Sequence, residues 1–220
     1  MKNTKDINEN EIINSLNEVK SSNFLKLFHK NSKALKEDNE CKSLVVSDTS
    51  ISEFKSIIKD IITNDNVLAL KDHIQHVSSS RFCHCLGVSY YSYVICKKLG
   101  LDYVSAARGG MLHDLYYYDW RNKHVEGQKR FHLLRHPRIA LNNALELFEL
   151  NDIEKDIILK HMWPLTIVLP KYPESYIVST VDKYCATNEV YKKFKRDRKL
   201  KLSLKHNKNK ILESTNKNKK

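Results

Sequence analysis

Apolar residues recur at helical spacing through most of the chain. In SDTSISEFKSIIKDII, a serine cap at Ser47 or Ser50 precedes apolar positions three or four residues apart. Similar spacings occur in RFCHCLGVSYYSYVICKKLG, DYVSAARGGMLHDL, PRIALNNALELF, NDIEKDIILKHM and ESYIVSTVDKYC. No stretch alternates apolar and polar residues for long enough to predict a strand, and the chain has only 5 Gly and 4 Pro. The pattern predicts an all-α fold, a compact helical bundle.

Polarity and charge divide the chain into three parts. Residues 1–48 are polar apart from the patch NFLKLFHK, so we expect a partly helical N-terminal arm. Residues 49–195 carry the helical pattern and form the predicted domain. The segment from residue 195 to the end holds 11 Lys or Arg and two acidic residues, a net +9 of the chain's +12. We expect residues 196–220 to be a disordered basic tail whose charge could weakly contact nucleic acid or an anionic membrane.

The composition also limits where the protein functions. No stretch reaches the roughly 18 to 20 continuous apolar residues of a membrane span, and MKNTKDINEN lacks the apolar segment of a secretory signal. The 5 cysteines form no CxxC pair. We therefore expect a cytoplasmic protein with reduced thiols and no membrane span.

Three histidines lie at notable places on the predicted helices. His84 shares a face with Val88, and alone it would be explained as a core histidine bonded to a carbonyl. His161 lies on the apolar side of another helix. His136 precedes Pro137, which we expect at the first position of its helix. His132 is the rival for the position of His136 if that helix begins earlier.

Asp182 lies on the apolar face of the last predicted helix, beside Val178 and Val181. Burying an unpaired carboxylate there would cost several kcal/mol. A cation must therefore meet it, either a metal ion or a basic side chain such as Lys183 or an arginine from another helix.

The sequence GGMLHDL places His113 and Asp114 side by side after Gly109 and Gly110. Adjacent helical residues point about 100° apart, so both reach one ion only near the end of the helix. The small residues before them allow a neighbouring backbone to come close.

Successive helical segments thus each contribute an inward His or Asp. Imidazole and carboxylate suit divalent ions such as Fe, Mn, Zn, Co or Ni, and a set of this size can hold one or two of them. The predicted metal ligands are His84, His113, Asp114, His136, His161 and Asp182.

The series H…HD…H…H…D in a helical domain resembles the HD-domain superfamily of metal-dependent phosphohydrolases, over about residues 70–190. The resemblance implies that His84, His113, Asp114 and Asp182 are the ligands of the shared metal site. It further implies that His136 and His161 are the additional histidines of the two-metal members. The segments RHPRIALNNALELF, IILKHM and IVSTVDKY are similar to the branch that hydrolyses diadenosine polyphosphates.

Divalent ions held by such ligands would lower the pKa of a bound water and polarise a phosphoryl oxygen. We therefore expect a hydrolase whose substrate is a phosphorylated small molecule, a nucleotide. A metal-activated water would cleave a phosphate ester or anhydride bond of this substrate. Asp114 is the expected bridging and water-orienting residue, and Asp119 is a general acid or orients a ligand. The predicted substrate-binding residues are Arg121, His124 and Lys160, and the alternative for such loop charges is simple solvation.

Two other functions stay open at this stage. One is a non-catalytic HD module that senses a nucleotide, which the intact set of ligand-type residues argues against. The other is a nucleic-acid-associated phosphodiesterase that uses the basic tail.

Overall fold

The structure is a computed structural model that describes residues 48–73, 80–118 and 132–217. Within these ranges it contains helices and no strand, so the predicted all-α fold is confirmed. The helices are α3 (Asp48–Ile57), α4 (Lys59–Ile62), α5 (Asp65–Leu68), the 3₁₀ turn η1 (Ala69–Asp72), α6 (Arg81–Leu99), α7 (Tyr103–Leu112), α8 (His132–Leu147), α9 (Asp152–Lys160) and α10 (Pro173–Lys217).

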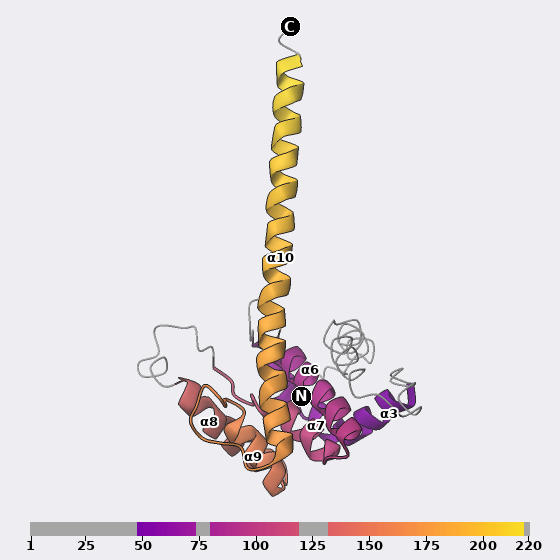
Figure 1. The fold of residues 1–220 in the computed structure, drawn as a ribbon, viewed down its shortest axis with the longest axis vertical. Coiled ribbons are helices and arrows are strands. Elements are labelled where there is room, and N and C mark those ends of the chain that lie inside the picture. Colours follow the sequence, from indigo (N-terminus) through magenta and orange to yellow (C-terminus); the bar gives the residue numbers. More distant parts are fainter. Residues whose placement is uncertain (1–47, 74–79, 119–131, 218–220) are drawn as a thin grey trace, which may run out of the picture.

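Helix α6 is the central element of the domain. Nearly every residue from Arg81 to Cys96 is buried, because α7, α10 and η1 pack around it. Helix α9 in turn packs against α7, α8 and α10. Figure 1 shows α10 running between α6 and α7 on one side and α8 and α9 on the other.

Two apolar clusters fill the domain. The larger one joins α3 to α6 and includes Phe54, whose ring centroid lies 5.1 Å from that of Tyr90 in an edge-to-face contact. The smaller one joins α6, α9 and α10 through Val88, Ile157 and Val178. Together the clusters fix the directions of the helices that carry the inward polar residues.

Helices α6 and α7 approach each other closely at the glycine pair. A Cβ atom on Gly110 would lie 2.9 Å from the Cα of Ser89, and one on Gly109 would lie 2.9 Å from Cγ2 of Ile157. The Ser89 hydroxyl donates a hydrogen bond of 2.6 Å to the carbonyl of Ala107. The pair of glycines therefore brings the end of α7 against both α6 and α9.

The helix ends follow familiar capping chemistry. The side chain of Ser80 accepts a bond from the Cys83 N–H at the start of α6, and Gly100 ends α6 with φ of 68°. Asn151 and Glu154 form a capping box at the start of α9. These caps fix where the helices begin and end.

Helix α8 begins earlier than the sequence predicted. It starts at His132, so Pro137 lies inside it and not at its first position. The turn before it contains Leu133, Leu134 and Arg135, which favour a helix, so α8 forms although Pro137 cannot donate a hydrogen bond to the carbonyl of Leu133.

The structure also differs from the expected disordered tail, since α10 continues to Lys217. The segment after Pro173 contains neither glycine nor proline, and its many Lys and Leu residues favour a helix. At about 1.5 Å per residue, the 45 residues of α10 extend to about 68 Å. Figure 1 shows much of this length projecting beyond the other helices as a shaft.

None of the helices in the described ranges combines the length and the hydrophobicity that crossing a membrane requires.

Candidate metal centre

The side chains predicted as ligands meet in the interior of the domain, and all of them are buried. They come from separate helices, and two of the positions are helix ends, where His113 closes α7 and His161 closes α9. The set is His84 of α6, His113 and Asp114 after α7, His136 of α8, His161 after α9, and Asp182 of α10.

One group of ligand-type atoms forms around Asp182. Its Oδ1 lies 2.9 Å from Nε2 of His84 and 3.6 Å from Nε2 of His113. One ligand atom from each of these residues lies within 4.8 Å of the others, which suits a shared ion.

A second group forms around Asp114. Its Oδ1 lies 3.4 Å from Nε2 of His136 and 3.5 Å from Nε2 of His161, and its Oδ2 lies 3.5 Å from Nε2 of His113. Atoms of His113, Asp114 and His161 also lie within 4.8 Å of one another. The two groups share His113, so they are adjacent parts of one centre.

The donors at this centre fit a divalent cation. The Nε2 atom of His113 is buried and has no hydrogen-bond partner among the described residues. The Nε2 atoms of His136 and His161 lie only 2.8 Å apart, so two nitrogen donors point at the same place. Buried polar atoms are almost always bonded, and nitrogen and carboxylate oxygen are the ligands that borderline divalent ions prefer.

Hydrogen bonds on the far sides of the rings orient the imidazoles. Nδ1–H of His113 donates to the carbonyl of Gly110, and Nδ1–H of His161 donates to the carbonyl of Ile158, both at 2.8 Å. A carbonyl can only accept, so each of these rings carries its proton on Nδ1 and keeps Nε2 for the centre.

Sequence reasoning missed Glu189, which performs the same role for His84. Its Oε1 lies 3.0 Å from Nδ1 of His84. The signal that could have found it is its position seven residues after Asp182, which is two turns along the same face of α10.

Charge within the centre shifts the pKa values of its members strongly. Burial lowers the pKa of His84, but its bonds to Asp182 and Glu189 outweigh burial and raise the pKa to about 10. Burial raises the pKa of Asp182, but the neighbouring imidazoles of His113 and His84 hold that pKa well below the usual value. Burial and the charges of neighbouring imidazoles lower the pKa of His161. Without a cation the carboxylates are thus balanced by protonated imidazoles, so binding an ion would release protons.

The alternative cationic partner of Asp182 is also present. Lys183 places its Nζ 3.0 Å from Oδ2 of Asp182 and donates to the carbonyl of His161. Because Lys183 contacts Oδ2, Oδ1 of Asp182 faces the two imidazoles.

The segment after the His-Asp pair is held to the start of α6. The guanidinium of Arg81 donates to the carbonyls of Tyr116 and Tyr118 and lies 3.6 Å from the centroid of the Tyr116 ring. The Tyr116 ring is buried, with its centroid 5.5 Å from that of His136. Tyr116 therefore packs against the centre.

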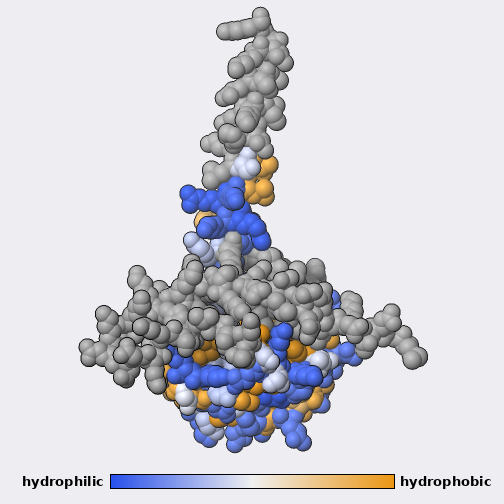
Figure 2. Space-filling model, turned by 90° about the vertical axis from the view of Figure 1, so that its right-hand side faces the viewer, coloured by the Kyte–Doolittle hydropathy of each residue, from blue (hydrophilic) through white to orange (hydrophobic). Residues whose placement is uncertain are grey.

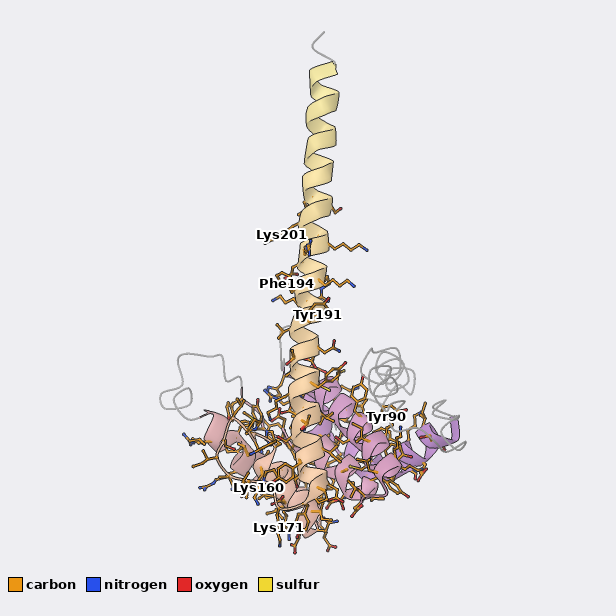
Figure 3. All side chains as sticks on the ribbon, viewed as in Figure 1. Tyr90, Lys160, Lys171, Tyr191, Phe194 and Lys201 are labelled. Carbon is orange, nitrogen blue, oxygen red and sulfur yellow. The ribbon has the colours of Figure 1, made fainter. Side chains whose placement is uncertain are left out.

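Of the other predicted site residues, the structure describes only Lys160. The ammonium of Lys160 forms an ion pair with Asp156, and Figure 3 shows Lys160 and Lys171 at the lower edge of the domain. Asp119, Arg121 and His124 lie in the part of the chain that is not described, so their roles stay predictions.

A helical domain with these buried donors defines a metal-binding class of protein, and comparison with known families agrees. Residues 81–187 match the family described as HD domain, so this part of the chain is an HD domain, of the superfamily of metal-dependent phosphohydrolases. Searches of curated proteins and of solved structures gave no significant match. The predicted resemblance to the superfamily is thus confirmed, whereas the similarity to the diadenosine polyphosphate branch is not.

Proposed function

We propose that this protein is a metal-dependent phosphohydrolase. Its substrate is a phosphorylated small molecule of the nucleotide class, in which it cleaves a phosphate ester or anhydride bond. The observation that carries the proposal is the convergence of four imidazoles and two carboxylates on one buried centre. The family match supports the same class of reaction. The cofactor is one or two divalent ions, drawn from Fe, Mn, Zn, Co or Ni.

The geometry favours two adjacent ion positions. His84, His113 and Asp182 would hold one ion, and Asp114, His136 and His161 would hold the other. Asp114 directs Oδ2 toward His113 and Oδ1 toward His136 and His161, so its carboxylate is the one able to bridge.

Bound divalent ions would supply a water of lowered pKa and positive charge for the phosphoryl oxygens. The carboxylate of Asp114 would orient such a water by accepting a hydrogen bond from it. We assign Asp119 as the general acid, or as a residue that orients a ligand. We assign the binding of substrate phosphates to Arg121, His124 and Lys160.

Replacing Asp114 by Ala tests the proposal. Wild-type protein should contain a divalent metal and hydrolyse at least one member of a phosphoester panel that includes nucleotides and dinucleoside polyphosphates. D114A should lose both properties, because it removes the carboxylate shared by the two positions. Elemental analysis and phosphate release measure the two effects, and D152A is the matched control because the Asp152 side chain is 82% exposed. Full turnover by D114A would refute the role of Asp114, and a wild type that binds metal but cleaves no substrate would favour the nucleotide-sensing module.

A specific observation also favours contact with nucleic acid as a second function. The described side chains of residues 193–201 are exposed, and Lys and Arg among them point to all sides of α10. Exposed Tyr191 and Phe194 lie on the same shaft as Lys201 (Figure 3), and aromatic side chains among basic ones suit single-stranded nucleic acid. Removal of the tail tests this contact.

A further inference from the structure

Helix α10 directs two carboxylates toward one histidine. Asp182 Oδ1 lies 2.9 Å from Nε2 of His84, and Glu189 Oε1 lies 3.0 Å from Nδ1 of the same ring. The side chain of His84 is fully buried, and that of Glu189 is 21% exposed. The imidazole is therefore held on both sides by acids two helical turns apart.

The contact of Glu189 determines which proton of His84 an ion can displace. Both carboxylates only accept, so each nitrogen of the metal-free ring donates a hydrogen bond; an ion at the centre would displace the proton of Nε2, while Glu189 keeps the proton of Nδ1. The carbonyls of Gly110 and Ile158 do the same for His113 and His161. Those carbonyls are fixed by the helices themselves, whereas His84 depends on a side chain that a single substitution removes.

A carboxylate partner also changes the strength of the ligand. A negative group bonded to the distal N–H of an imidazole raises the basicity of the other nitrogen and fixes the plane of the ring. This contact therefore favours binding of an ion at the position formed by His84, His113 and Asp182.

We propose that Glu189 is a positioning residue of the metal centre, which fixes the ring and tautomer of His84 and thereby sets the affinity of this position for a divalent ion. The proposal rests on the proposed function, since it requires that the centre bind metal. Glu189 lies beyond residue 187, where the family match ends, so the centre would depend on a part of α10 outside the matched domain.

The experiment compares E189A and E189Q with the wild type in the full-length chain. Manganese affinity is measured on metal-free protein by competition with a chelator. E189A should bind manganese about 10- to 100-fold more weakly, the usual effect of losing such a partner. E189Q should lose less, because its amide oxygen still accepts from Nδ1–H but carries no charge. E149A is the matched control, since Glu149 is exposed between α8 and α9, and it should bind like the wild type.

A second measurement separates positioning from a general effect on folding. Nitrogen NMR of zinc-loaded protein should show a single His84 tautomer protonated at Nδ1 in the wild type and in E149A. In E189A the hydrogen-bonded Nδ1 proton should disappear or shift strongly. Thermal unfolding of the metal-free variants shows whether each is folded. If E189A is not folded, the manganese affinity of E189Q tests the role of Glu189.

The outcomes distinguish this proposal from the proposed function. If E189A and E189Q bind manganese as tightly as E149A, the role of Glu189 is overturned, whatever the turnover. If the affinities fall as expected but no phosphoester is cleaved, the role of Glu189 stands and the hydrolase proposal fails. If the wild type binds no divalent ion, both proposals are overturned.

Discussion

Asp156 is a buried carboxylate that is satisfied without a metal ion. It pairs with the ammonium of Lys160 and accepts hydrogen bonds from the Lys171 N–H at 2.8 Å and the Ser175 hydroxyl at 2.7 Å. Burial raises the pKa of Asp156, but these donors outweigh it and lower the pKa below its usual value. By contrast, the neighbours of Asp114 in the centre are imidazoles, which are metal ligands when they lose their protons.

The lowered pKa of Asp156 predicts a specific dependence of stability on pH. Because its pKa is lower in the folded than in the unfolded protein, the ionised carboxylate stabilises the fold above its unfolded pKa of about 4. That contribution is lost as the pH falls through the folded pKa. D156N should reduce the free energy of unfolding near neutral pH by about 1–3 kcal/mol, and the difference from the wild type should shrink in acid. Urea unfolding between about pH 3 and pH 7 measures this, with D152N as control, and a difference independent of pH would contradict it.

At this scale the sequence predicted which ligand-type side chains are buried together better than it predicted the residues around them. Each ligand occupies an inward position in a helical pattern, and such positions can be recognised one helix at a time. Arg81 could not be found in this way, and the spacing of Glu189 from Asp182 indicates its face of the helix but not its partner, because the partners lie 35 and 105 residues away, respectively. Only the packing of distant helices places these side chains beside Tyr116 and His84.

Among the helices, the contact of α7 with its neighbours determines where the His-Asp pair lies. Gly110 faces the backbone of α6 at Ser89, whereas Gly109 faces the side chain of Ile157 in α9. A backbone cannot move aside without shifting its whole helix, but an isoleucine side chain can adjust. The neighbour of Gly109 can therefore make room for an added methyl group more easily than the neighbour of Gly110.

The difference predicts unequal effects for two similar substitutions. G110A should destabilise the protein by about 1–3 kcal/mol or more, despite the better helix propensity of alanine, and should weaken metal binding because His113 moves with α7. G109A should cost less. Thermal unfolding and metal titration of both variants measure this order. Equal stability of G110A and wild type would show that α6 and α7 can separate without cost.

The helices themselves were largely predictable, and their ends were less so. Serine, asparagine and glycine caps mark α6 and α9 clearly in the sequence. The start of α8 was misjudged because proline was taken as a first position, whereas α8 begins five residues earlier and continues through it despite the hydrogen bond that proline cannot donate. The continuation of α10 was missed because its basic composition outweighed its helix propensity in the prediction.

At the scale of the whole molecule, the described residues form a domain and a shaft made of one helix. Exposed apolar side chains such as Phe194 and Leu200 are scattered on the shaft among basic ones, and its described part is mostly hydrophilic in Figure 2. No apolar stripe runs along this part to pack against the domain. The free energy of folding therefore comes from the domain, and the shaft adds mainly charge.

Deleting residues 196–220 should therefore distinguish the properties of the domain from those of the shaft. The truncated protein keeps Glu189 and the centre, so its unfolding temperature, metal affinity and turnover of small substrates should match the full chain. Its affinity for single-stranded RNA should fall, and the dependence of that affinity on salt should become shallower. Fluorescence anisotropy at several salt concentrations measures both. Unchanged RNA binding after truncation would rule out the tail as the contact.

The bond between His84 and Asp182 joins residues 98 positions apart, which has a consequence for biosynthesis. Asp182 is translated after every histidine of the centre, so a nascent chain presents imidazoles before it has the full complement of carboxylates. Closing so long a loop is also slow compared with forming the individual helices. The full set of ligand-type side chains is thus assembled only when the end of the domain has left the ribosome and folded onto α6, so an ion that needs all of them would bind late.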